Sequence, residues 1–247
     1  MPSSAPNVSK NTSIRPHSDS GGIEGPTGRV KTVQRLKTSY PSLMASTDPG
    51  QQVITHACDL ADSNNLDKNL ESLLSKVTND GESKLNHVVF TAGDGLNQRP
   101  ISELRLEDCT TTSTVRVVAP LLLSKHLFNT YLERSPDSSF TLTTGVNSTM
   151  PSKGWTMTAW RGQGVEGLMR GLAVDMAPIR VNVVSPGAIK TELLAAVPED
   201  LLKSWADMTT VKRIGRPEDT AEAYVYFMKD GFVTGTKIDT SGGRLLL

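Results

Sequence analysis

Two side chains in this sequence have the chemistry to hold a ligand directly, the indole of Trp155 and the guanidinium of Arg116. An indole stacks on flat rings and attracts cations over its face, a contact worth roughly 0.5–2 kcal/mol. A guanidinium pairs with phosphates or orients amide oxygens through its rigid fork of N–H groups. The alternatives are that Trp155 is a packed loop aromatic and that Arg116 is a cation on a helix surface. The elements that position the two side chains decide between these interpretations.

A glycine cluster at Gly21–Gly25 is a candidate turn for binding phosphate groups. Such turns follow an apolar strand and open a helix whose N-terminus faces the phosphates. No apolar strand precedes this cluster, and Pro26 to Gly28 leave no room for the helix. We therefore interpret residues 1–28 as a disordered or atypical leader, rich in Ser, Pro and Gly. A mis-spliced or truncated gene would give the same pattern.

The composition excludes several classes of protein. The 247 residues carry 26 Lys+Arg and 26 Asp+Glu, so no surplus of cations exists to displace the counterions of nucleic acid. The longest apolar run, Val117 to Leu123, is too short to cross a bilayer. Two cysteines, Cys58 and Cys109, are too few for a disulfide framework and favour a reducing compartment. We expect a cytoplasmic enzyme that contacts neither membrane nor nucleic acid.

From residue 29 to 247 the hydrophobic periodicity predicts one domain of alternating strands and helices. The expected strands are Val53–Cys58, His87–Thr91, Phe140–Thr144, Val181–Val184 and Thr236–Asp239. The expected helices cover about 30–36, 66–77 with Ser63 or Asn64 as cap, 108–132, 158–176 and the segment after Pro217. The inner strands are nearly continuous apolar runs, which is typical of a parallel sheet covered on both faces. The predicted fold is a doubly wound, Rossmann-like α/β sheet whose N-terminal strand and glycine turn are degenerate or missing, with its ligand crevice at the carboxyl ends of the strands.

Several motifs resemble the short-chain dehydrogenase/reductase family over residues 29–247. They are Val165–Leu168, Ala177–Gly187 followed by Thr191, Val233–Thr236, Ser241–Gly243, Cys58–Leu60 and Thr91–Gly93. The run Ile-Arg-Val-Asn-Val-Val-Ser-Pro-Gly is the most specific of them. The resemblance implies a nicotinamide dinucleotide cofactor.

The same resemblance assigns roles to residues at the strand ends. It implies that Asp59 accepts a hydrogen bond from adenine and that Ala92 and Gly93 let the backbone approach the cofactor ribose. It also implies that Gly187 begins the loop that holds the nicotinamide carboxamide, through backbone groups of Ile189 and the Thr191 hydroxyl. The alternative for Asp59 is a strand-end or capping residue. For Gly93 it is an ordinary strand-to-loop glycine.

The expected catalytic centre departs from that family. The family uses a serine, a tyrosine and a lysine four residues after the tyrosine. Here the tyrosine position falls on Thr158 and the lysine position on Gly162, while Thr144 lies near the serine position. The family's helix asparagine falls at about Arg116. Arg161, next to the lysine position, we interpret as a charge on the helix surface.

The missing phenol has a chemical consequence. Reduction of a ketone needs a proton for the developing alkoxide, and a phenol beside a lysine supplies it. An iminium ion is already cationic and accepts hydride without that proton. The sequence therefore favours a C=N bond over a ketone as hydride acceptor.

A narrower resemblance rests on Met150–Trp155, Glu166–Met176 and Arg116–Pro120. These segments are similar to the fungal reductase/Diels–Alderases of prenylated indole alkaloids of the paraherquamide and malbrancheamide type. That group uses NADPH and also lacks the tyrosine–lysine pair. In it an aspartate precedes a Pro-Gly-Trp unit and helps catalysis. This sequence has Ser152 in place of the aspartate and Lys153 in place of the proline.

The resulting hypothesis is an NADPH-dependent reductase of fungal secondary metabolism that acts on an imine or iminium of an alkaloid-like small molecule, with or without coupled cyclisation. Ser152 and Trp155 are its candidate catalytic residues, and Arg116 joins the cofactor-binding set. We expect a homo-oligomer without a metal. The alternatives are a non-redox cyclase or isomerase on the same fold and a catalytically silent pseudoenzyme subunit.

The degenerate glycine turn predicts weak NADPH binding. Without a helix N-terminus facing the pyrophosphate, the site loses its main source of phosphate affinity. Calorimetric titration of the purified protein with NADPH measures this directly. A sub-micromolar dissociation constant would contradict the prediction and would mean that Gly21–Gly25 form a working turn.

Overall fold

The computed structural model of the protein describes residues 55–247 except 94, 96–99, 112 and 196, together with the single residues 38 and 41. Four parallel strands follow one another in chain order, β1 (His87–Val89), β2 (Ser139–Thr143), β3 (Arg180–Pro186) and β4 (Lys237–Thr240). Phe140 of β2 is paired with Val88 on one side and with Val181 on the other. The parallel Rossmann-like architecture expected from the sequence is confirmed.

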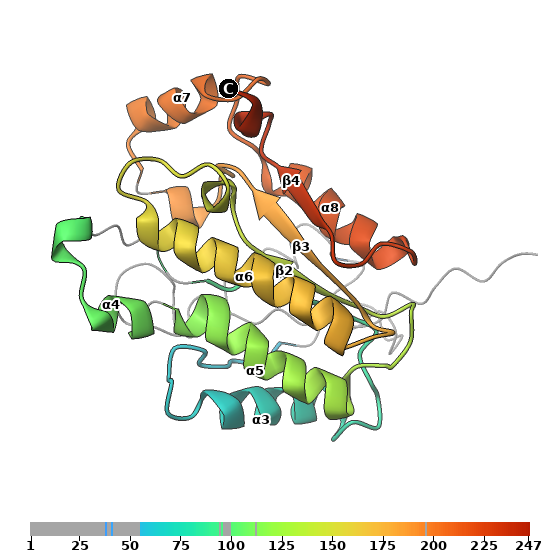
Figure 1. Ribbon diagram of the computed structural model, residues 1–247. Coiled ribbons are helices and arrows are strands. Elements are labelled where there is room, and N and C mark those ends of the chain that lie inside the picture. Colours follow the sequence, from blue (N-terminus) through green and yellow to red (C-terminus); the bar gives the residue numbers. More distant parts are fainter. Residues whose placement is uncertain are drawn as a thin grey trace, which may run out of the picture.

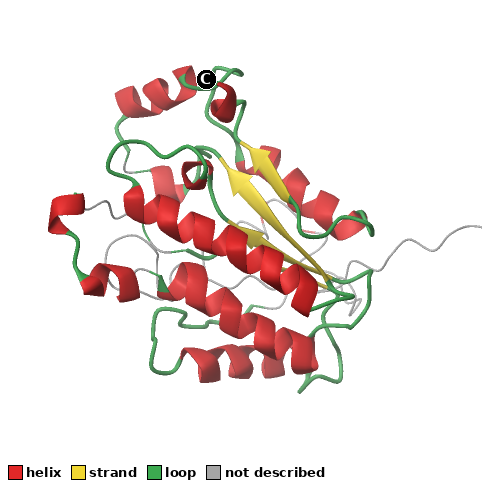
Figure 2. Ribbon diagram, viewed as in Figure 1, coloured by secondary structure: helices red, strands yellow, loops and turns green. Residues whose placement is uncertain are grey.

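Helices cover both faces of this sheet (Figures 1 and 2). The α-helices are α3 (Leu66–Thr78), α4 (Leu106–Thr111), α5 (Ala119–His126), α6 (Thr156–Asp175), α7 (Glu199–Asp207) and α8 (Pro217–Lys229). Two π-helical segments, Thr114–Val118 and Leu127–Tyr131, adjoin α5, and short 3₁₀ turns cover Ile101–Glu103, Val146–Ser148, Glu192–Leu194 and Arg244–Leu246. Helices α3, α5 and α6 lie on one face, α8 lies on the other, and α7 lies beyond the carboxyl ends of β3 and β4.

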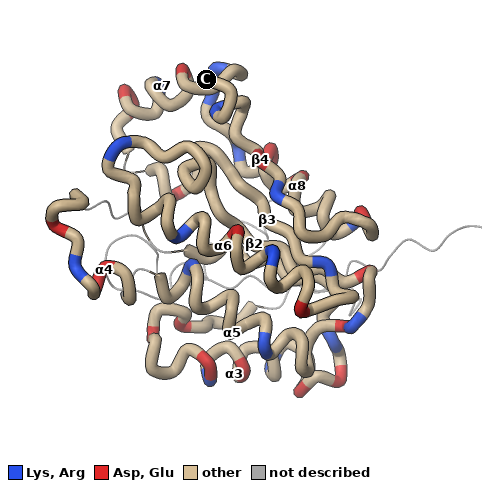
Figure 3. Tube along the Cα trace, in the orientation of Figure 1, with Lys and Arg blue, Asp and Glu red and all other residues tan. Residues whose placement is uncertain are grey.

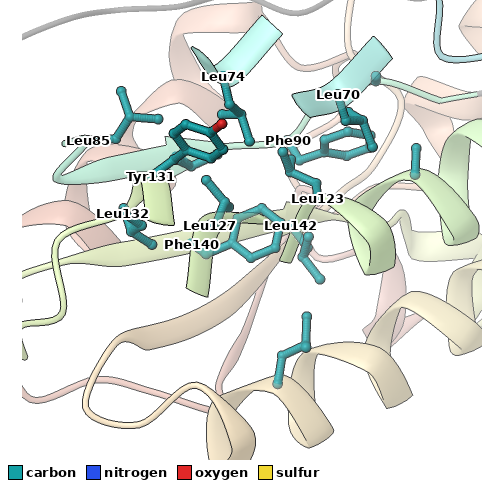
Figure 4. Close-up of a cluster of buried hydrophobic side chains, with 14 of the residues drawn as sticks. Leu70, Leu74, Leu85, Phe90, Leu123, Leu127, Tyr131, Leu132, Phe140 and Leu142 are labelled. Atoms are coloured by element: carbon teal, nitrogen blue, oxygen red, sulfur yellow. The ribbon is translucent and has the colours of Figure 1, made fainter. Parts of the chain in front are cut away.

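The main core fills the space between the sheet and the helices α3, α5 and α6. Figure 4 shows leucines of α3 and α5 meeting Phe90, Phe140 and Leu142. Alternation along β3 separates the two faces, because Val181 and Val183 belong to this core while Val184 packs with Phe227 of α8. Each fully buried side chain of this size contributes about 1.5–3 kcal/mol. The sheet is therefore anchored from both sides, and its strand ends are held in place.

Two local predictions near α3 are wrong. Residues 55–58 form no strand, and residues 53 and 54 of the expected strand lie outside the described residues. The chain here enters a turn, in which the Asp59 carboxylate accepts hydrogen bonds from the backbone N–H groups of Ala61 and Asp62. The N-cap residue of α3 is Asn65 rather than Ser63 or Asn64. The leader 1–28, its glycine cluster and the expected helix 30–36 also lie outside the described residues.

The long helix expected over 108–132 is divided. Helix α4 ends at Thr111, and the chain resumes as a π-helical segment that contains Arg116. The extra residue in a π turn rotates the following side chains relative to the preceding helix, and such turns are frequent at functional sites. The predicted helix at Pro217 is confirmed with proline in its first turn, and Asp219 accepts a hydrogen bond from the Arg216 backbone. Helix α7 had no counterpart among the expected elements.

The charged residues agree with the balanced composition. Figure 3 shows basic and acidic residues interspersed along the helices. Within the described part of the chain, no helix combines the length and the apolar character that a membrane span requires.

Arg180 fastens the start of β3 to α8 and to the loop before β2. Its side chain is buried and donates hydrogen bonds to the carbonyls of Pro136 at 2.7 Å and Phe227 at 2.6 Å. Longer bonds reach the carbonyls of Asp137 and Met228. One guanidinium therefore satisfies the end of α8, where the last carbonyls of a helix have no partner within it.

We expect Arg180→Met to lower the free energy of unfolding by about 3 kcal/mol, because several buried carbonyls lose their donor. Urea denaturation measures the change. Arg105→Met is the matched control, since this exposed side chain pairs only weakly with Glu107, and it should shift stability by less than about 0.5 kcal/mol. Equal effects of the two substitutions would contradict the anchoring role of Arg180.

Candidate functional site

A cavity of about 590 Å³ opens at the carboxyl ends of β2, β3 and β4. Polar residues at the strand ends line it, with Thr143 as the last residue of β2, Thr144 directly after it and Ser241 after β4. The volume lies in the range of small-molecule sites, and the position is the one where open α/β sheets bind ligands. The expected location of the crevice therefore agrees with the structure.

The loop after β3 brings three predicted residues into this cavity. Gly187, Ile189 and Thr191 all line it. Gly187 packs closely against the segment after β4, because a Cβ there would lie 3.0 Å from the Cα of Ser241. The loop is held by Lys190, whose backbone N–H donates to the Gly215 carbonyl at 2.8 Å. Ile189 and Thr191 thus lie in the cavity wall, where the Thr191 hydroxyl donates a hydrogen bond to the Ile189 carbonyl at 3.4 Å.

The structure gives Gly93 a different role from the expected one. Ala92 and Gly93 are buried, and neither lines the cavity, whereas Thr91 does. A Cβ on Gly93 would lie 1.9 Å from the Nη2 atom of Arg116. The guanidinium therefore occupies the space over the glycine that we expected a ribose to approach. Arg116 itself is half-buried and lines the cavity, which disfavours the interpretation as a plain surface cation.

Asp59 lies away from this cavity. It does not line it, and its carboxylate accepts the backbone N–H of Ala61 at 2.9 Å. The side chain of Asn69 in α3 donates to the Asp59 carbonyl at 3.0 Å, which fastens the turn to the helix. This geometry favours the capping alternative for Asp59, and the adenine contact stays a prediction.

Helix α6 contributes one wall of the cavity. Thr158 and Arg161 both line it, and Arg161 is only 5% exposed. Its Nε atom donates to the Met157 carbonyl at 3.1 Å. The interpretation of Arg161 as a helix-surface charge is therefore wrong. The signal was present in the sequence, because Thr158, Arg161 and the buried Val165 share one helix face by their spacing of three and four residues.

At the expected lysine position, α6 is packed against the segment after β2. A Cβ on Gly162 would lie 2.6 Å from the Cβ of Ser148 and 2.9 Å from the Oγ1 of Thr144. The Thr144 hydroxyl donates to the Gly162 carbonyl at 3.0 Å. This packing leaves no room for a side chain at residue 162.

The roof of the cavity contains both candidate catalytic residues and one that the sequence analysis missed. Ser152 and Trp155 line it from the loop that precedes α6. The backbone carbonyl of Ser152 accepts a hydrogen bond from the backbone N–H of Trp155 at 3.1 Å. Trp205 of α7 also lines the cavity and contacts Trp155, with the ring centroids 6.4 Å apart and the ring planes at 81°. The apolar spacing of Leu202, Trp205 and Ala206 indicated a helix face that could have identified Trp205.

The charged side chains that line the cavity are all arginines, namely Arg116, Arg161 and Arg244, and no acidic residue is among the lining residues that the structure describes. Arg244 is oriented by a contact of 3.2 Å from its Nη1 atom to the sulfur of Met150. The Tyr224 hydroxyl is 2.8 Å from the Thr143 Oγ1 atom, which donates to the Phe90 carbonyl. Burial raises the pKa of the Tyr224 phenol, against the smaller lowering effects of the Thr143 bond and the Arg116 charge. This phenol therefore stays protonated at neutral pH.

These features define the class of protein. A family model described as an SDR-like Rossmann domain matches residues 27–247, and the chain belongs to this short-chain dehydrogenase/reductase family. Among its relatives is the short-chain dehydrogenase/reductase malC of Malbranchea aurantiaca, 46% identical over 225 residues, which are 90% of this chain and 82% of malC.

Solved structures agree with the family assignment. The structure titled MalC Reductase/Diels-Alderase from Malbranchea aurantiaca superposes with a TM-score of 0.83 and 40% identity, over 96% of this chain and 87% of that one. A small-chain dehydrogenase in complex with NADPH has a TM-score of 0.72 and 22% identity, over 97% of this chain and 99% of the other. The second likeness shows the fold alone. The similarity to this family and to the reductase/Diels–Alderase group that the motifs indicated is confirmed.

The packing at residue 162 yields a stability test. Gly162→Ala should lower the free energy of unfolding by about 1–3 kcal/mol, because the new methyl group overlaps Ser148 and Thr144. Gly171→Ala in the same helix is the matched control. Nothing lies within 4 Å of its added Cβ, so this variant should gain up to about 1 kcal/mol from helix propensity. Urea denaturation of both variants decides, and a stabilised Gly162→Ala would show that α6 leaves room for a side chain there.

Proposed function

We propose that the protein is an NADPH-dependent reductase of fungal secondary metabolism whose hydride acceptor is a C=N bond in an alkaloid-like small molecule. The observation that carries this proposal is the combination found at one cavity. The loop Pro186–Thr191 presents its backbone and hydroxyl groups, while the lysine position at Gly162 is closed by packing. The relative malC and the solved structure titled MalC Reductase/Diels-Alderase support the same class of enzyme through their names.

The described residues fit the nicotinamide half of the cofactor. The Ile189 backbone and the Thr191 hydroxyl would hold the carboxamide, and Arg116 would pair with a phosphate. The three arginines of the cavity suit the negative charge of a dinucleotide. When bound, NADPH supplies the hydride. The adenine half has less support, because the Asp59 carboxylate is engaged in its own turn.

The acceptor class follows from the proton supply. Thr158 stands where the family has its tyrosine, and an aliphatic hydroxyl is too weak an acid to protonate a developing alkoxide. Tyr224 is the phenol in the cavity wall, but burial raises its pKa and its hydroxyl is bonded to Thr143. An iminium needs no proton during hydride transfer. The site therefore suits imines better than ketones.

The cavity also restricts where a cationic substrate can lie. Arg161 and Arg116 line the cavity beside α6, and the described lining offers no carboxylate there for a cation. The indole face of Trp155, at the roof, attracts one. The Ser152 hydroxyl lies beside it and can accept a hydrogen bond from an iminium N–H, although it carries no balancing charge. The iminium would consequently lie under Trp155 and Ser152.

A non-redox cyclase on the same fold is the second candidate. It is favoured by the Arg116 guanidinium over Gly93, which fills the space expected for a ribose. Such an enzyme would use the roof and the arginines to hold a reactive intermediate in one shape.

A panel of cyclic imines and matched cyclic ketones tests the proposed reaction. The protein is incubated with NADPH and each substrate, and consumption of NADPH and the products are measured. We expect turnover of imines at least about tenfold above that of the matched ketones, because a ketone needs the missing proton donor. A preference for ketones would overturn the argument, and cyclisation without NADPH consumption would favour the second candidate.

A further inference from the structure

Trp205 lies where it can contact a ligand in the cavity, and it does not belong to the hydrophobic core. It lies in the middle of α7, a helix in which no residue is fully buried. The apolar residues of α7 line two adjoining cavities: Trp205 lines the candidate site, and Leu202 and Ala206 line a second cavity that shares Thr191 and Leu194 with it. The aromatic contact of Trp205 is with Trp155, which lines the candidate site as well.

Together Trp205 and Trp155 form an aromatic corner, which we define as these two side chains. Their planes meet at 81°, and each ring is half-exposed within the cavity. The rings come from separate elements, the loop before α6 and the helix α7. A flat ring system can stack on one indole and meet the edge of the other, which are the two favourable aromatic geometries.

The surroundings of the corner match an extended apolar ligand. Leu193, Leu194 and Met208 add apolar side chains to the lining of the same cavity, and Arg244 contacts Met150 in the loop that carries Trp155. A ring system of two or more fused rings can contact the aromatic corner and these apolar side chains together. A single small ring can contact only part of it.

We propose that Trp205 is a specificity-determining residue that, with Trp155, selects fused aromatic substrates over monocyclic ones of the same reactivity. The preference for imines rests on the proposed function above. The selection itself is a matter of binding and does not require that the reaction take place.

Two imines with the same functional group test this selection, dihydroisoquinoline with fused rings and pyrroline with one ring. Calorimetric titration measures the dissociation constant of each without cofactor. For Trp205→Leu we expect about fivefold weaker binding of dihydroisoquinoline and less than about twofold change for pyrroline, the size expected of one lost aromatic contact. Trp205→Phe should retain most of the affinity.

Trp160→Leu is the matched control, because Trp160 is 50% exposed on α6 and is not among the residues that line the cavity. It should leave both dissociation constants unchanged, and the melting temperatures of all variants should agree within a few degrees. Equal loss for both imines, or the same loss in Trp160→Leu, would overturn the proposal, as would a lack of preference in the unaltered protein.

Turnover separates this inference from the proposed function. Selective binding of dihydroisoquinoline without any NADPH consumption would support the aromatic corner and contradict the reductase. Reduction of both imines with equal KM would support the reductase and contradict the corner.

Discussion

The close approach of α6 to the segment after β2 determines the shape of the site. Thr144 donates to the Gly162 carbonyl, and Ser148 donates to the buried carboxylate of Glu166 one turn further along. Lys237 of β4 lies 3.6 Å from the same carboxylate. These bonds hold one face of α6 against the strand ends. Because the helix is fixed there, residues 158 and 161 face the cavity and residue 162 cannot carry a side chain.

The chemistry of the cavity is divided between its walls. Backbone and hydroxyl groups from the strand ends lie opposite an apolar roof with two indoles, and the charge is supplied by arginines alone among the described lining residues. Groups that bind and orient are therefore plentiful, while a group that can release a proton at neutral pH is not.

The sequence predicted β3 correctly, because Val181–Val184 is apolar except for Asn182, and such nearly continuous apolar runs are typical of strands covered on both faces. The loop Gly187–Thr191 and the roof residues Ser152 and Trp155 were likewise placed correctly at one cavity. Contacts between distant segments were not predictable in the same way. That Gly93 is required by the Arg116 side chain follows only from how a π turn orients residue 116. The burial of Arg161 could have been derived from its spacing to Val165, but a charged residue on a helix is usually exposed.

The position of α7 outside the core bears on how such proteins can change their ligands during evolution. Its side chains are not part of the core, so replacing them costs little folding stability, whereas a side chain added at Gly162 in the α6 wall would overlap Ser148 and Thr144. Mutation can therefore explore new ligand shapes through this one helix while the rest of the domain stays intact. Divergence in what related enzymes accept should accumulate at the positions of α7, and an engineer who wants a new substrate range should randomise that helix first.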